Sequence, residues 1–369
     1  MGTGPRAPIK GRGATFNPGN RFRRDTREAV DDGWSPQAAE GEGEAEEREL
    51  PPLKTTVMIQ RSRTIIARNT SPDIPFTQSI NPYQGCEHGC VYCYARPTHA
   101  YLDLSPGLDF ETKLFAKPDA ATLLIAELAK PGYLCDAIAM GTNTDPYQPI
   151  EREWKVTRQV LEVLSACEHP VSIVTKSALV ERDIDLLAPM AAKNLARVYI
   201  SITTLDRDLA RTLEPRAAAP HRRLAAVKAL SDAGIPVGVM TAPIIPQLTD
   251  KDLEAILEAA SANGARYAGW TLVRLPHEVK DLFRDWLAQH YPLRAEHIMS
   301  MIQQMRGGRD NDPRFGSRMR GEGLFADLIA SRFDLACRRL GLNRERTVMD
   351  TSRFKPPRTE AQRAQLDLF

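Results

Sequence analysis

From Thr77 to Arg274 the sequence alternates between short apolar, β-rich runs and longer segments with helical periodicity. The apolar runs are nearly continuous, which is typical of parallel strands covered by helices. Six such β–α units predict either an incomplete (β/α) barrel or a doubly wound open sheet, and both place their sites at the carboxyl ends of the strands. The predicted strands are Thr77–Asn81, Ala137–Met140, Val171–Thr175, Arg197–Thr203, Val237–Thr241 and Trp270–Arg274, and the helices include Val156–Ala166, Asp183–Ala192, Pro220–Ala233 and Asp250–Ala260.

The two ends of the chain differ from this core in composition. Residues 1–30 contain seven Lys and Arg against two acids, whereas residues 31–50 contain eight acids and one Arg. Such a polar, charge-segregated stretch cannot bury enough apolar surface to fold by itself. We therefore expect five regions: a disordered tail (1–53), a lead-in segment (54–76), a core barrel (77–275), a helical Arg-bearing region (276–350) and a flexible tail (351–369).

The composition also bears on the compartment. The first thirty residues lack the apolar region of a secretory signal, and no apolar run approaches the roughly 20 residues that span a bilayer. We expect a cytoplasmic protein with no membrane partner. In that compartment the six cysteines are not expected to form disulfides, so a tight cysteine cluster indicates metal or redox chemistry.

Cys86, Cys90 and Cys93 form such a cluster, with the spacing C-x3-C-x2-C, directly after the first predicted strand. Gly85 and Gly89 allow the backbone to wrap tightly, and three thiolates can ligate three irons of a cubane. No fourth cysteine is nearby, so the fourth iron would take an external ligand. Three alternatives remain: an electron-transfer ferredoxin, which would need a fourth thiolate; a zinc site completed by His88 or His99; and a chance group of buried thiols.

With Asn81-Pro-Tyr-Gln-Gly85 before it and Tyr92 inside it, this spacing resembles the radical S-adenosylmethionine (SAM) superfamily. In that family SAM chelates the open iron, and an electron from the cluster cleaves SAM to methionine and a 5′-deoxyadenosyl radical. The resemblance implies a [4Fe-4S] cluster, SAM, and a one-electron donor of the flavodoxin or ferredoxin type. It also implies an α/β fold: a partial (β/α)6 TIM-like barrel with a helical C-terminal extension.

Over residues 77–275 the resemblance is closest to the spore photoproduct lyase-like branch and implies a set of SAM contacts at successive strand ends. Gly141, Thr142 and Thr144 match the place where the family binds the SAM amino group. Lys176 would pair with the methionine carboxylate, while Ser201 and Thr203 would meet the ribose. Arg223 matches a family arginine that Glu214 would orient, Arg216 is a further contact, and Tyr92 would pack near the adenine. Each residue type also has an ordinary structural role, as a cap, a solvated charge or a core aromatic.

Two neighbouring side chains, Asp145 and Gln148, are expected to face the same mouth and to meet substrate. One departure concerns the end of the second strand, where photoproduct lyases carry a hydrogen-donating cysteine. Here that stretch is Met140-Gly141-Thr142, and Cys135 lies at the opposite end of the strand. This difference counts against dimer-lyase chemistry unless a tyrosine serves as the donor. An uncharacterised bacterial radical SAM group is more similar still, matching Gly11–Ala14, Asn20–Phe22 and Asn81–Gly85, but it implies no substrate.

Two features suggest nucleic acid. The arginine-rich stretch 306–323 is interpreted either as a phosphate clamp or as a solvated loop with internal ion pairs. Gln365-Leu-Asp-Leu-Phe369 is similar to the pentapeptide that docks bacterial polymerases and repair proteins on the sliding clamp, or else it is an apolar end that folds back. We expect an enzyme acting on DNA or a nucleotide-containing molecule. The alternatives are a protein or small-metabolite substrate, or a redox-sensing adaptor of the clamp.

Overall fold

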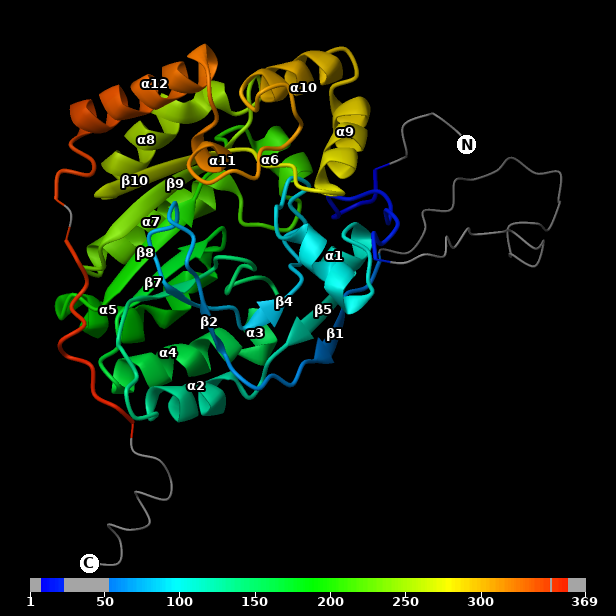
Figure 1. Cartoon of the computed structure of the whole chain (residues 1–369). Coiled ribbons are helices and arrows are strands. Elements are labelled where there is room, and N and C mark those ends of the chain that lie inside the picture. The colour runs from blue at the N-terminus through cyan, green and yellow to red at the C-terminus, as the bar shows by residue number, and fades with distance from the viewer. Residues whose placement is uncertain (1–7, 23–52, 346, 358–369) are drawn as a thin grey trace, which may run out of the picture.

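A computed structural model describes residues 8–22, 53–345 and 347–357 and shows a curved sheet with helices on its outer side (Figure 1). The sheet has seven strands in the order β10-β9-β8-β7-β6-β3-β2. All neighbours are parallel except β2 and β3, which are antiparallel. The strands are β2 (Ile66–Arg68), β3 (Gln78–Ile80), β6 (Ile138–Met140), β7 (Val171–Thr175), β8 (Ala196–Ser201), β9 (Val237–Ile244) and β10 (Tyr267–Leu272).

The strand order decides between the two architectures that the sequence left open. Along the sheet the six parallel strands follow one another in chain order, without the reversal that defines a doubly wound sheet. Strands β2 and β10 pair with no further strand within the described residues, so the barrel is incomplete. The predicted partial (β/α)6 barrel is therefore confirmed.

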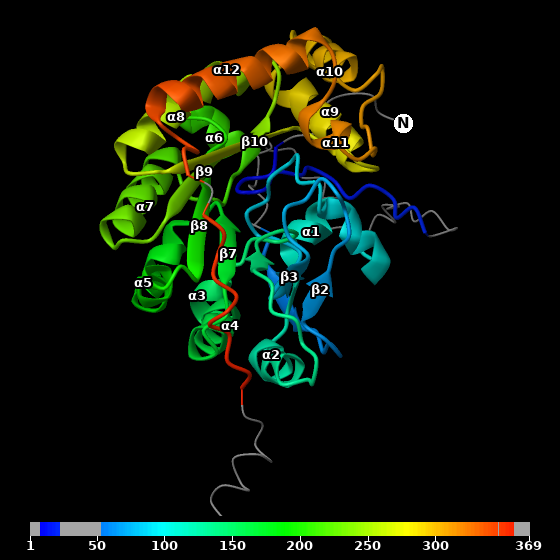
Figure 2. The same cartoon turned by 60° about the vertical axis from the view of Figure 1, so that its left-hand side comes forward.

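The outer helices cover the sheet, and an apolar core fills the space between the two layers (Figure 2). The longer helices of this layer are α2 (Ala120–Leu128), α4 (Val156–Ala166), α5 (Ile184–Ala192), α7 (Pro220–Asp232) and α8 (Leu253–Ala262). Short elements join them: α1 (Leu108–Thr112), α3 (Glu151–Trp154), α6 (Arg207–Leu213), η2 (Arg96–Leu102), η3 (Ala178–Asp183) and η4 (Asp250–Asp252).

The predicted elements agree with these bounds to within a few residues, and among the strands β9 and β10 differ most. Strand β10 begins three residues before the predicted start at Trp270, and β9 continues to Ile244. Ala268 and Gly269 conceal the start of β10, because small residues carry little β-propensity. They pair with Val239 and Met240, so the register across β9 includes them in the sheet.

A second, three-stranded sheet that the sequence pattern did not reveal leads into the cysteine cluster. It has the order β1-β5-β4, with β1 at Thr56–Ile59, β5 at Lys113–Ala116 and β4 at Tyr83–Gln84. Strand β4 has only two residues and ends immediately before Gly85. The Cys86 N–H donates to the Phe110 carbonyl at 3.0 Å, which joins the cluster loop to α1.

The C-terminal region contains α9 (Val279–His290), α10 (Ala295–Gln304), α11 (Ser317–Arg320) and α12 (Leu324–Leu340). In the arginine-rich stretch, Arg306 is buried and donates to the Val273 carbonyl at 2.7 Å, beyond the end of β10. Arg314 pairs with Asp312, and Arg318 pairs with Asp73. These contacts match the interpretation with internal ion pairs. No helix in the described parts of the chain combines the length and hydropathy needed to cross a bilayer.

Both predicted tails are wrong where the structure describes them. Within residues 8–22, Ala14 is buried and Thr15 hydrogen bonds to Asp285 of α9. Within residues 351–357, Phe354 packs against Tyr133 and His169. Composition misled here because polar bonds to the folded core, and single aromatic contacts, hold segments that could not fold alone. Gln365–Phe369 lies outside the described residues.

Candidate active site at the carboxyl ends of the strands

The cluster loop, residues 85–94, turns sharply at two glycines. Gly85 has φ +76° and Gly89 has φ +68°, in the left-handed region that favours glycine. Space also requires them: a Cβ on Gly89 would lie 2.8 Å from the Glu111 carboxylate, and one on Gly85 2.7 Å from Leu114 Cδ2. The loop can therefore wrap closely only with glycine at these positions, as the sequence predicted.

The three clustered thiols are removed from solvent and close to one another. Cys86 and Cys90 are buried, Cys93 is half-buried, and none forms a disulfide. Burial raises the pKa of all three thiols, and the pKa of Cys86 is raised further by Asp145, Cys90 and Cys93. Among the described residues, no three His, Cys, Asp or Glu side chains lie close enough together to hold one metal ion. The three thiols are close enough to influence one another electrostatically, since Cys90 and Cys93 both raise the pKa of Cys86.

One ring nitrogen of each histidine considered for a zinc site contacts another part of the protein. His88 Nδ1 lies 3.4 Å from the Asp145 carboxylate, and His99 Nε2 lies 2.9 Å from the Lys113 carbonyl oxygen. Across the residues that the structure describes, neither histidine forms a group with two further His, Cys, Asp or Glu side chains that could hold a single metal ion. The donor set that remains fits a cubane with three protein thiolates.

A buried polar group, which we call the Glu214 group, lies beside Cys90. Its members are Tyr92, Lys176, Thr203, Glu214 and Arg223. Glu214 accepts hydrogen bonds from Tyr92 Oη, Thr203 Oγ1 and the Arg223 guanidinium, and Lys176 Nζ lies 3.6 Å away. Burial favours the protonated acid, but Arg223 and Lys176 outweigh it and lower the pKa of Glu214 to about 2. One carboxylate and two cations leave the group with a net positive charge.

Most of the predicted SAM contacts meet in or next to this group. Arg223 donates to the Ser201 carbonyl at 3.0 Å, which brings the end of β8 to α7. Lys176 follows β7, donates to the Ala242 carbonyl at 3.2 Å and lies 5.9 Å from the Tyr92 ring centroid. The predicted orientation of Arg223 by Glu214 is observed. The Tyr92 hydroxyl is bonded to Glu214, a partner that the sequence did not suggest.

Arg216 lies apart from the Glu214 group. Its guanidinium pairs with Glu87 at 2.8 Å, on the outer side of the cluster loop. There it lines a surface hollow of about 520 Å³ together with His88, Arg152 and Arg222. A role for Arg216 in the SAM site is therefore not favoured by its contacts.

The loop after β6 approaches the neighbouring strand closely. Gly141 has φ +86°, and a Cβ there would lie 1.9 Å from the Val174 carbonyl oxygen, so only glycine fits. The Thr144 hydroxyl is buried and donates to the Tyr83 carbonyl at 2.9 Å. The Thr142 carbonyl accepts a hydrogen bond from Tyr94. Thr144 thus fastens this loop to β4, whereas Gly141 allows the close packing.

Asp145 and Gln148, which the sequence interpretation assigned to substrate, both form hydrogen bonds within the protein. Gln148 is fully buried; its amide donates to the Gly85 carbonyl at 3.1 Å and accepts from the Glu87 N–H at 2.9 Å. Asp145 accepts from Thr175 Oγ1 and from the Lys176 N–H and faces His88. These residues brace the cluster loop against β6 and β7.

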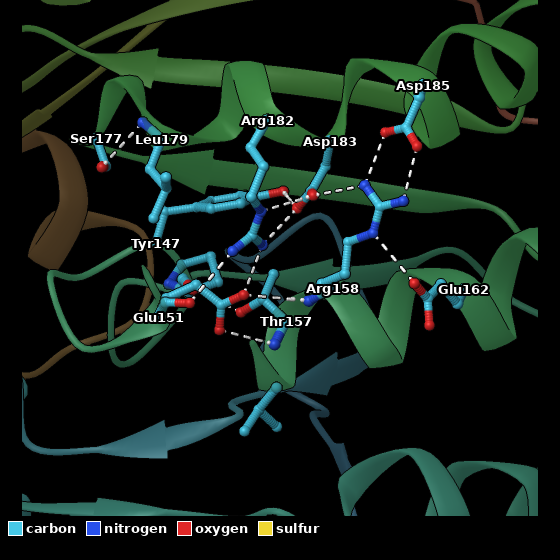
Figure 3. Close-up of polar contacts among 12 residues, drawn as sticks. Tyr147, Glu151, Thr157, Arg158, Glu162, Ser177, Leu179, Arg182, Asp183 and Asp185 are labelled. Carbon is cyan, nitrogen blue, oxygen red and sulfur yellow. Dashed lines mark hydrogen bonds and ion pairs between the residues drawn. The ribbon is translucent and has the colours of Figure 1, made fainter. Parts of the chain in front are cut away.

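Behind this loop, a network of ion pairs fixes its far end to η3 (Figure 3). Tyr147 donates to Asp183 at 3.0 Å, and Asp183 also accepts from Arg158 and Arg182. Arg182 pairs in addition with Glu151 at 2.6 Å. The network positions the β6 loop from outside the barrel. Its members are scattered over α3, α4 and η3, so no local sequence pattern indicates it.

Arg96 and Tyr94 were also missed by the sequence interpretation. Arg96 is fully buried and donates to the carbonyls of Cys90 and Gly89, so it holds the cluster loop from beneath. Tyr94 follows the third cysteine and is partly exposed, and burial of its hydroxyl raises its pKa to about 12. Their closeness to the cysteines in the sequence was the available signal.

Comparisons with known proteins agree with this architecture. The model of the Radical SAM superfamily matches residues 80–260. An uncharacterised protein of Mycobacterium tuberculosis is 38% identical over 59% of this chain and 65% of its own length. One from Methanocaldococcus jannaschii is 30% identical over 59% of this chain and 78% of its own. The chain thus spans about two thirds of the mycobacterial relative.

Among solved structures, a spore photoproduct lyase complexed with dinucleoside spore photoproduct aligns with TM-score 0.47 and 17% identity. That alignment covers 64% of this chain and 66% of the lyase chain. The matched residues 80–260 contain the cysteine loop and the Glu214 group, and a [4Fe-4S] cluster and SAM are the cofactors that such a family implies. The chain belongs to the radical SAM superfamily.

Proposed function

We propose that the chain is a radical SAM enzyme in which Cys86, Cys90 and Cys93 hold a [4Fe-4S] cluster. The observation that carries this proposal is the cluster of three thiols, two buried and one half-buried, beside a polar group with net positive charge. When bound, the cluster supplies the electron that cleaves SAM to methionine and a 5′-deoxyadenosyl radical. The protein's task is to position both cofactors and to exclude water.

Lys176 is the residue best suited to receive the SAM carboxylate. Its side chain is 15% exposed, and its ammonium group contacts the Ala242 carbonyl and the Glu214 carboxylate. Glu214 and Arg223 neutralise each other in the buried layer, so the charge of Lys176 remains available to a ligand. Ser201 and Thr203 at the end of β8 are proposed for the ribose hydroxyls, and Gly141 for close backbone approach.

Tyr94 is our candidate for returning a hydrogen atom to the product. It donates to the Thr142 carbonyl beyond the end of β6, where photoproduct lyases carry a cysteine and this chain has Met140-Gly141-Thr142. The Arg274 guanidinium lies 5.2 Å from its ring centroid, which fixes the ring beside the cluster loop. Tyr94→Phe removes only the hydroxyl, so it tests this role with little change in packing.

The substrate we propose is DNA or a nucleotide-containing molecule. Support comes from the lyase-like sequence motifs, from the clamp-like pentapeptide at Gln365–Phe369, and from the incomplete barrel, whose unpaired edges leave room for a bulky polymer. The pentapeptide makes a sliding clamp the proposed partner. The arginine-rich stretch gives no support, since Arg306, Arg314 and Arg318 are bound within the protein.

Turnover of SAM tests the enzyme proposal directly. We expect anaerobically reconstituted protein to release 5′-deoxyadenosine from SAM once its cluster is reduced. The reductant is dithionite or a one-electron donor of the flavodoxin or ferredoxin type. Cys86→Ala, Cys90→Ala and Cys93→Ala should each abolish release, whereas Cys135→Ala, outside the cluster loop, should not. Release at background level from protein that carries its cubane would favour the adaptor.

Binding measurements test the substrate. Filter binding to single- and double-stranded DNA at two salt concentrations should show affinity that weakens as salt rises, because phosphate contacts displace counterions. Affinity that is absent, or independent of salt, would favour a protein or small metabolite. Deletion of residues 365–369 should abolish binding to a sliding clamp; unchanged binding would remove that partner.

A further inference from the structure

Residues 11–16, which we call the N-terminal strap, lie directly on the outer face of the cluster loop (Figure 1, dark blue, beside α1 and α9). A Cβ on Gly13 would lie 1.8 Å from the Gly89 carbonyl oxygen and 3.2 Å from the Val91 nitrogen. Gly13 has no left-handed φ, so contact with the loop, and not backbone conformation, requires glycine there. The strap therefore contacts the part of the cluster loop that lies between the first and third cysteines.

A buried ion pair joins the strap to the loop. Glu111 of α1 is fully buried and accepts from the Gly13 N–H at 3.1 Å and the Ala14 N–H at 2.9 Å. The same carboxylate pairs with Arg96, whose guanidinium donates to the Cys90 carbonyl at 2.9 Å and the Gly89 carbonyl at 3.2 Å. Strap, carboxylate, guanidinium and cluster loop therefore form one continuous set of hydrogen bonds.

Arg12 ties the strap to a second point of the loop. It donates to the Glu111 carbonyl at 2.9 Å and to Thr55 Oγ1 at 3.0 Å. Thr55 in turn donates at 2.6 Å to Glu87, the residue after the first cysteine. The loop is thus braced by Gln148 and Asp145 on its barrel side and by the strap on its outer side.

We propose that the N-terminal strap is a component of the cluster centre, which fixes the three thiols and shields them from oxygen and other solutes. This rests on the proposed function for the identity of the bound cluster, but the shielding of the thiols does not depend on it. Gly13, Arg12 and Glu111 act as positioning residues through the loop. A segment whose composition resembles a dispensable tail is then necessary for a long-lived cluster.

Gly13 of the strap and Gly19, which lies just after it, provide a matched test. Gly13→Ala forces a methyl group into the Gly89 carbonyl, whereas Gly19→Ala meets nothing within 4 Å. Overpacking at Gly13 should increase the equilibrium constant for local opening of the cluster loop about 10- to 100-fold. We expect the cluster of the Gly13→Ala protein to bleach in air faster by this factor and its electron paramagnetic resonance signal to change, while Gly19→Ala matches the wild type.

A second readout separates the strap from the cluster. In protein without metal, alkylation of Cys86 and Cys90, followed by mass spectrometry, should accelerate by the same factor in Gly13→Ala and also in Arg12→Gln, which leaves the Gly13 contact in place. Wild-type rates of both alkylation and bleaching in folded variants would overturn the proposal. A wild type that never binds a cluster would refute the proposed function, and the alkylation rates would still decide the role of the strap.

Discussion

Lys176 Nζ lies 3.6 Å from the carboxylate of Glu214, so residues from two successive β–α units share one charge centre. Lys176 follows β7, and Glu214 follows α6, which comes after β8. The parallel barrel brings them together because neighbouring strands end at the same edge. Arg223 is buried and pairs with one oxygen of the Glu214 carboxylate. Lys176 lies near the other oxygen and is partly exposed.

Removal of the Lys176 charge should weaken SAM binding. Lys176→Met keeps the length of the side chain but loses a charge-assisted contact, which predicts a dissociation constant about 10- to 100-fold higher. Calorimetry with cluster-loaded protein checks this. Lys228→Met, on the exposed face of α7, is the control and should bind SAM normally. Equal affinities for the two variants would contradict the assignment.

The network of Figure 3 contains its own control, because Arg158 pairs with two aspartates. The side chain of Asp183 is fully buried, whereas that of Asp185 is 59% exposed. Asp183→Asn should lower the free energy of unfolding by about 2–3 kcal/mol, because the fully buried Asp183 carboxylate is the shared partner of Tyr147 and of two half-buried arginines. Asp185→Asn should cost less than about 1 kcal/mol. Urea denaturation measures both, and similar losses would show that burial is not the deciding factor.

Gln148 is expected to matter for the cluster and not for substrate recognition. Gln148→Leu leaves the Gly85 carbonyl and the Glu87 N–H without partners, which costs about 1–3 kcal/mol for each buried group. Iron and sulfide content after anaerobic reconstitution should fall. Gln159→Leu, on the exposed face of α4, should retain full content. A Gln148→Leu protein with a complete cluster but altered substrate affinity would restore the original expectation.

His169 should make stability depend on pH. Burial lowers its pKa from 6.5 to about 4, although the Pro170 carbonyl opposes the shift. Between these values the unfolded chain binds a proton that the folded chain does not, so stability falls as pH drops from 6.5 towards 4. The loss is at most about 3 kcal/mol. Urea denaturation of metal-free protein at pH 7 and pH 5 should show a smaller decrease for His169→Asn than for the wild type.

Local sequence determined the cysteine loop and the order of the β–α units. The spacing of Cys86, Cys90 and Cys93 and the glycines beside them are short-range signals, since the loop geometry depends on residues a few positions apart. The alternation of apolar runs and amphipathic helices likewise predicted six parallel strands, because each unit follows its own periodicity.

Only the tertiary structure decided which polar residues remain available to a cofactor and which hold the cluster loop in place. Gln148 and Thr144 look like ligands in sequence, yet their partners are backbone atoms of β4 and the cluster loop. Gly13 and Glu111 look unremarkable, yet they meet Gly89 from distant parts of the chain. A hydrogen-bond partner is set by long-range packing, and a buried polar group takes whichever partner the fold provides.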